Sequence, residues 1–101
     1  MYYSGQIATG DTNIASNKWT HVAISRTGGT SRLFQDGILV GSGSDTTDLT
    51  ATQYYIADSA SSSGEMFGFI SNVRVIKGTA LYTTDFTPPA APLTNVTNTK
   101  L

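Results

Sequence analysis

Apolar and polar positions alternate along this chain over short runs. Clusters of Gly, Asn, Asp and Ser bound each run, which is typical of β-strands joined by turns rather than of helices. The pattern predicts six or seven strands, and those in the first part of the chain are expected at residues 2–8, 20–26, 31–35, 38–41 and 53–57.

Two glycine-containing pairs mark where the chain should reverse. Gly28-Gly29 supplies backbone freedom for a tight turn, and Asp36-Gly37 tolerates the positive φ angles that primed hairpin turns require. The sequence therefore predicts a three-stranded antiparallel meander over residues 20–41.

The second half of the chain is less regular. Residues 43–52 are polar and are expected to form a surface loop. Residues 66–77 hold the longest apolar-rich run, and they are expected to form a central strand, or a strand in which a bulge near Gly68 or Asn72 switches the parity. Residues 81–83 fit a short edge strand or a turn, and the prolines after them should end regular pairing. The boundaries that follow are a domain over residues 1–93, with residues 94–101 as a tail or the start of another strand.

Composition narrows the class of protein. Hydrophobic residues make up 39% of the 101 residues, charged residues only 13%, and the net charge is −1 without a cluster of basic residues. A nucleic-acid partner is not expected, because it would require a basic stripe. No apolar run is long enough for membrane insertion. The polar, weakly charged composition favours an extracellular or virion location. The sequence contains no cysteine, so disulfide bonds cannot stabilise the fold.

Catalytic chemistry is not expected. His21 lacks a nucleophilic serine elbow or cysteine to serve, so a structural or surface role is predicted for it. Glu65 is the only glutamate, and the six aspartates fall mainly in turns and loops, so the paired carboxyl groups of a glycosidase are missing. A transition-metal site would lack nitrogen and sulfur ligands.

A calcium ion is a possible cofactor. It takes oxygen ligands, which loops holding Asp45, Asp48 and Asp58 would offer if they converge.

Sugar binding is the other candidate chemistry, since it needs exposed aromatic rings and planar polar groups. In the pair Tyr54-Tyr55, the period of two points one ring outward, so these tyrosines with Gln53 and Asn17 are the candidate carbohydrate-binding residues. Asn13 and Asn72 are further polar groups of this kind, whereas Trp19 is expected to fill the core.

Three pieces of the sequence carry a family resemblance. In order they are "KWTHVAISR", "SRLFQDGILVGS" and "FGFISNVRVIKGTALYTTDFTPP". Together they resemble the laminin G-like branch of the concanavalin A-like lectin and glucanase superfamily, and "GTALYTTDFTPPAAPL" is similar to forms found in phage and marine viral structural proteins.

This resemblance implies an all-β fold, an antiparallel jelly-roll β-sandwich. Family members carry more strands before the Trp-x-His strand, so the sandwich is expected to be truncated on its N-terminal side. A second copy of the chain, as a homo-oligomer, or a neighbouring segment would then close the core, because burial of apolar area is the largest favourable term available. The glutamate-rich catalytic strand of the glucanases has no counterpart.

The function expected on these grounds is non-catalytic and lectin-like. The module would bind a glycan or polysaccharide of a host surface, as part of a phage or viral surface or tail protein. The alternative is a structural or assembly domain that contacts other virion proteins, and a more distant option is an ancillary domain beside a hydrolase.

Overall fold

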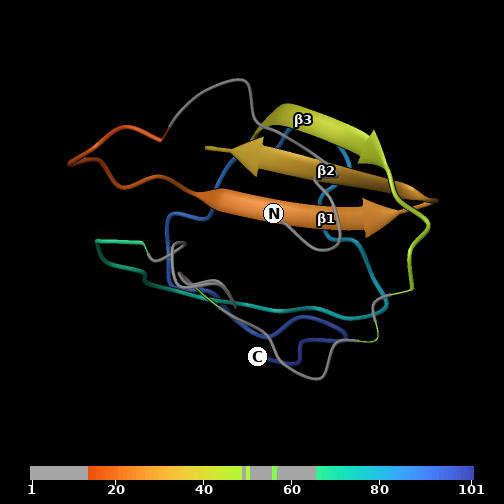
Figure 1. Cartoon of the computed structure of the whole chain (residues 1–101). Coiled ribbons are helices and arrows are strands. Elements are labelled where there is room, and N and C mark those ends of the chain that lie inside the picture. The colour runs from red at the N-terminus through yellow and green to blue at the C-terminus, as the bar shows by residue number, and fades with distance from the viewer. Residues whose placement is uncertain (1–13, 49, 51–55, 57–65) are drawn as a thin grey trace.

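A computed structural model describes residues 14–48, 50, 56 and 66–101 of the chain. Its regular part is one antiparallel sheet with strand order β1-β2-β3, formed by β1 (Val22–Thr27), β2 (Thr30–Gln35) and β3 (Ile38–Ser44). Figure 1 shows the three strands side by side, with the C-terminal segments beneath and behind them. The predicted meander is therefore confirmed.

Both hairpins turn through two residues whose backbone is left-handed. Gly28 and Gly29 have φ angles of 57° and 72°, and Asp36 and Gly37 have φ angles of 50° and 83°. Positive φ at both central positions is the signature of the primed turns that match the twist of paired strands. The turn residues identified in the sequence thus set the register of the sheet.

The register places alternate residues on the two faces of the sheet. Ala23 lies opposite Phe34 across β1 and β2, while Ile24 lies opposite Leu33. Between β2 and β3 the register shifts at Leu33/Phe34, so β3 carries an extra residue at that point.

One face of the sheet carries the core. Phe34 is fully buried, and its ring meets the rings of Tyr82 and Phe86 at centroid distances of 6.5 and 5.4 Å. Tyr82 and Phe86 stack on each other, and the Ser25 hydroxyl donates a hydrogen bond to the Tyr82 carbonyl. Residues 82–86 therefore cover this face without forming a strand.

The opposite face is more open. Val22, Ile24 and Ile38 are 48%, 50% and 55% exposed. Burial of these half-exposed apolar side chains against another surface would stabilise the protein further.

Residues 66–77 run beneath the sheet, in teal in Figure 1. The C-terminal residues return to lie against them: the Val75 N–H donates to the Leu101 carbonyl, and Ile76 bridges antiparallel to Thr99. The prediction of a full central strand over residues 66–77 is wrong for the described chain, because only this end of the run finds backbone partners. Residues 98–101 supply those partners.

The structure also bears on the loop expected after the meander and on two of the other expected strands. The predicted loop over residues 43–52 begins later, because β3 extends to Ser44. The expected strands at residues 2–8 and 53–57 lie outside the described residues, apart from Ile56, which is exposed. The all-β class is confirmed, and within the described part of the chain there is no helix of the length and apolarity needed to cross a membrane.

Candidate functional site

A hollow of about 400 Å³ lies where β1 begins and the β2–β3 turn reverses. We call it the Trp19 hollow. Its walls come from the start of β1, the Asp36 turn and two segments of the C-terminal half, namely Trp19, Thr20, His21, Asp36, Ser71, Asn72, Pro89, Ala91 and Leu93.

The lining of the Trp19 hollow is half apolar and half polar. An indole ring, two other apolar residues and a proline stand beside a carboxylate, an amide, two hydroxyls and an imidazole. Ligand pockets of roughly 300–1,000 Å³ typically combine apolar walls with a few placed polar groups. The hollow is at the small end of that range, so it suits a compact ligand with one apolar face and polar edges.

Trp19 is the most exposed large side chain of this lining, at 70%. The prediction that it fills the core is wrong. Regular pairing starts at Val22, and residues 16–18 form a turn with Asn17 at a φ angle of 58°, so Trp19 lies before the strand instead of within its alternation. An exposed indole offers a large flat face at a low entropic penalty.

Asp36 extends the β1–β2 pairing toward the Trp19 hollow. Its N–H donates to the His21 carbonyl at 2.8 Å, and its Oδ1 accepts the His21 N–H at 3.0 Å. Its Oδ2 lies 3.3 Å from Lys18 Nζ. The His21 N–H, with help from Lys18 and against the effect of burial, lowers the pKa of Asp36 below 3.8, so the carboxylate is ionised at neutral pH.

His21 has a structural place, as the sequence predicts. Its ring packs edge-on against Tyr82 and Phe86, with centroid distances of 6.4 and 5.5 Å. Its Nδ1 and the Thr20 hydroxyl oxygen are buried and have no hydrogen-bond partner within the described structure. A buried polar atom without a partner costs about 1–3 kcal/mol, so these two atoms lower the stability of this part of the fold.

Of the sequence-predicted carbohydrate residues, the described part of the chain includes Asn17 alone. Gln53, Tyr54 and Tyr55 lie outside the described residues, so their predicted roles stay predictions. Asn17 is exposed in the turn before Trp19 and does not line the Trp19 hollow. Asn72, a polar group that the sequence also suggested, does line it.

The described part of the chain includes two of the three aspartates proposed for calcium. Asp45 is 4% exposed, Asp48 is exposed, and Asp58 lies outside the described residues. Within residues 14–48, 50, 56 and 66–101, no group of three His, Asp or Glu side chains is placed to hold a metal ion.

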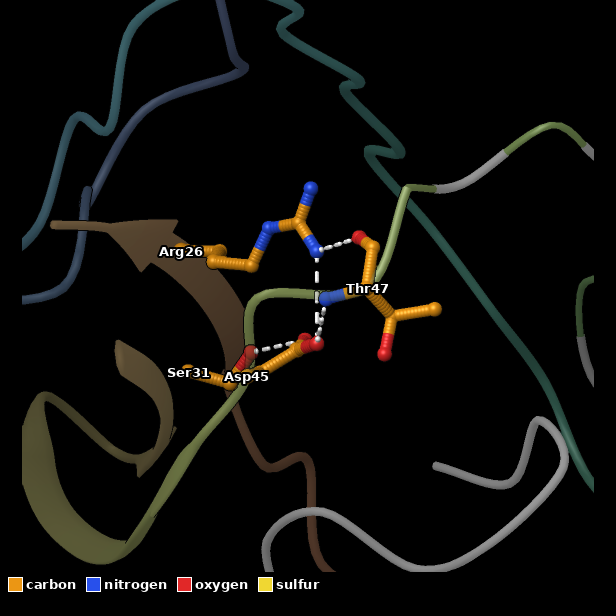
Figure 2. A network of polar contacts seen from close by, with 4 residues as sticks. All are labelled: Arg26, Ser31, Asp45 and Thr47. Atoms are coloured by element: carbon orange, nitrogen blue, oxygen red, sulfur yellow. Dashed lines mark hydrogen bonds and ion pairs between the residues drawn. The ribbon is translucent and has the colours of Figure 1, made fainter. Parts of the chain in front are cut away.

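Asp45 has its own polar network just after β3, shown in Figure 2. Its Oδ2 accepts the Ser31 hydroxyl at 2.8 Å, and its Oδ1 accepts the Thr47 N–H at 3.1 Å. Arg26 Nη1 lies 3.3 Å from Oδ1 and also donates to the Thr47 carbonyl. Both carboxylate oxygens are thus held by protein donors, and a cation at Asp45 would have to compete with Arg26.

Sequence reasoning missed most of the Trp19 hollow. Ser71, Pro89, Ala91 and Leu93 carry no signal of their own, because their part depends on contacts across the fold. Trp19 could be recognised in the sequence as an aromatic residue flanked by polar positions. Its exposure could not be predicted, because the sequence does not indicate at which residue β1 begins.

The comparison with protein families gives one match. The sequence model of a laminin G domain family, described as the concanavalin A-like lectin/glucanases superfamily, matches residues 2–83. The matched range holds β1, β2 and β3, together with the Trp19, Asp36 and Asn72 walls of the hollow. No curated protein and no solved structure matches the chain.

Proposed function

The chain belongs to the concanavalin A-like lectin/glucanase superfamily, and from that premise we propose that it is a non-catalytic, lectin-like module that binds carbohydrate. The observation that carries the proposal is the exposed Trp19 beside the polar side chains of the Trp19 hollow. Pyranose rings present C–H faces that pack on aromatic rings and hydroxyl edges that need hydrogen-bond partners. The hollow offers both kinds of surface.

We propose a module without catalytic activity because of the number of carboxyl groups that line the Trp19 hollow. Glycoside hydrolysis uses two carboxyl groups that flank one bond. Among the described residues that line the hollow, Asp36 is the single carboxylate, and its hydrogen bonds to His21 hold it as part of a turn. Sugar hydroxyls would meet an acceptor there, without an acid to protonate a leaving group.

We further propose that the module belongs to a phage or viral surface or tail protein and recognises a host-surface glycan outside the cell. The low proportion of charged residues, 13%, supports this location. A small hollow implies weak binding at each site, and many tethered copies on a particle would raise the overall avidity.

A glycan array probed with the full chain, multimerised on streptavidin, tests the function. We expect binding to a restricted set of bacterial or algal polysaccharides, and loss of that binding in Trp19→Ala. Phe67→Ala is the matched control, because Phe67 is 97% exposed and does not line the Trp19 hollow. Silence on every polysaccharide would remove the carbohydrate proposal.

The second candidate function is assembly with other copies or other virion proteins. Phe67 and Phe69 are 97% and 88% exposed, and apolar surface of this kind is typical of contact regions. Analytical ultracentrifugation of the wild type and of a Phe67→Ser/Phe69→Ser double variant tests it. We expect a homo-oligomer that the double variant dissociates. A well-folded wild-type monomer at micromolar concentration would contradict self-assembly.

A further inference from the structure

We propose that the Trp19 hollow selects uncharged sugars and discriminates against acidic ones, with Asp36 as the residue that sets this specificity. The inference rests on the proposed carbohydrate-binding function and names its ligand class. It follows from the charges that line the hollow, from the capacity of Asp36 to accept further hydrogen bonds, and from the exposed polar side chains of Ser71 and Asn72.

The charge of the lining has one sign. Asp36 is ionised at neutral pH, because the hydrogen bond from the His21 N–H and the nearby Lys18 lower its pKa. Among the described residues that line the Trp19 hollow there is no lysine or arginine. Lys18 approaches Asp36 Oδ2 from outside the lining, and its side chain is 62% exposed against 41% for Asp36, so solvent screens the lysine charge more than the carboxylate charge. A uronate or sulfated sugar placed here would set its own anion against Asp36 without a cation in the lining to hold it.

The same carboxylate favours hydroxyl groups. Asp36 receives one hydrogen bond from the His21 N–H and one from Lys18 Nζ. An ionised carboxylate has about four acceptor positions, so acceptor capacity remains for sugar hydroxyls. Hydrogen bonds to a charged acceptor are stronger than bonds between neutral groups. A neutral polyol therefore gains at Asp36 from the charge that repels an acidic one.

The remaining polar walls also suit hydroxyl groups. Asn72 and Ser71 are exposed and line the hollow, and the side chain of each can donate and accept hydrogen bonds. A hydroxyl both donates and accepts, so it complements both side chains. A carboxylate or sulfate only accepts, and it would leave the acceptor atoms of these walls unmatched.

Asp36→Asn separates the charge of this residue from its structural role. Asn-Gly is among the most favourable sequences for a primed turn, so the variant keeps the backbone geometry at a φ angle of 50°. Its amide oxygen still accepts the His21 N–H. The substitution therefore removes the negative charge while it preserves the turn, which circular dichroism and thermal melting would verify.

The test uses the full chain, multimerised, on an array of matched probes: neutral galacto-oligosaccharides and glucans beside oligogalacturonides and sulfated galactans. We expect the wild type to favour neutral probes by about fivefold, a ratio that like-charge repulsion at a partly exposed site supports. Asp36→Asn should reduce this ratio to about one, and Trp19→Ala should weaken binding to every probe by about tenfold. Leu101→Ala, at an apolar residue that is 63% exposed and does not line the hollow, should change neither quantity. Raising the salt concentration should bring the two classes of probe together, because it screens the repulsion.

The failures are distinguishable. If wild-type protein binds carbohydrate but prefers acidic probes, or if Asp36→Asn leaves the ratio unchanged, this inference is overturned and the proposed function stands. If binding occurs and Trp19→Ala retains it in full, carbohydrate binding stands and its location in the Trp19 hollow is overturned. If no probe binds at all, both the function and the inference fail together.

Discussion

The N–H of Phe86 donates a hydrogen bond to the carbonyl oxygen of Gly37 at a distance of 2.9 Å. A Cβ atom at Gly37 would overlap the carbonyl oxygen of Phe86, and the φ angle of Gly37 is 83°. The contact joins the β2–β3 hairpin to the segment that brings Phe86 onto Phe34. Glycine at this position therefore satisfies two demands, a left-handed backbone and a close approach of two chain segments.

Replacement of Gly37 by alanine should destabilise the fold strongly. The new Cβ meets both a left-handed backbone and the Phe86 carbonyl, and we expect the free energy of unfolding to fall by about 3 kcal/mol or more. Gly28→Ala is the matched control, because Gly28 has a φ angle of 57° but no neighbouring atom within 4 Å of such a Cβ. Its loss should be about 1–2 kcal/mol. Urea denaturation measures both, and equal losses would contradict the close-approach argument.

Asp45 should contribute more to the free energy of unfolding than Asp48. Its removal leaves Ser31, which is buried, and Arg26, which is partly buried, without their carboxylate partner. We expect Asp45→Ala to lower the free energy of unfolding by about 3 kcal/mol. Asp48→Ala, at an exposed position, should change it by less than about 0.5 kcal/mol. A chemical denaturation series gives both values, and similar values would show that the network in Figure 2 contributes little.

Calcium should not raise the melting temperature through Asp45. Both oxygens of this carboxylate already accept hydrogen bonds from protein groups, and Arg26 lies against one of them. A ligand that binds only the folded state stabilises it by RT ln(1 + L/Kd), where L is the free ligand concentration. Thermal melting in millimolar calcium and in chelator should therefore coincide for this site. A rise that Asp45→Asn abolishes would show that calcium displaces Arg26.

The sheet core depends on Phe34. It is fully buried between β1, β3 and the rings of Tyr82 and Phe86, so Phe34→Ala should lower the free energy of unfolding by about 3–5 kcal/mol. Phe67→Ala removes the same atoms from a side chain that is 97% exposed and should have little effect. Comparable losses from the two variants would show that Phe67 is covered in solution, as self-assembly would require.

The hairpins could be predicted from sequence because their information is local. Gly28-Gly29 and Asp36-Gly37 each determine a two-residue turn, and alternation then assigns Phe34 to one face. The exposure of Trp19 could not be predicted in this way, because it depends on the residue at which β1 begins to pair with β2. The hydrogen bonds between His21 and Asp36 continue this pairing beyond the start of β1, and Trp19 lies before them. Asp45 lies directly after β3, in the predicted loop, but its burial could not be predicted, because its partners Arg26 and Ser31 are far from it in the sequence. Residues 66–77 show the same limit, because alternation indicates an extended chain and does not identify its partner.

Acid titration should reveal the contribution of Asp36 to stability. Its pKa in the folded state lies below 3.8, chiefly because the His21 N–H donates to its carboxylate. The folded protein then binds fewer protons than the unfolded chain in the range between the two pKa values, so stability rises with pH there. The stabilisation is complete above the unfolded-state pKa and disappears as the pH falls through the folded-state value. We expect the free energy of unfolding of the wild type to drop more steeply with falling pH than that of Asp36→Asn, measured by urea denaturation between about pH 2 and about pH 5. A difference between the two proteins that stays constant across this range would show that the His21–Asp36 hydrogen bond does not favour the charged form.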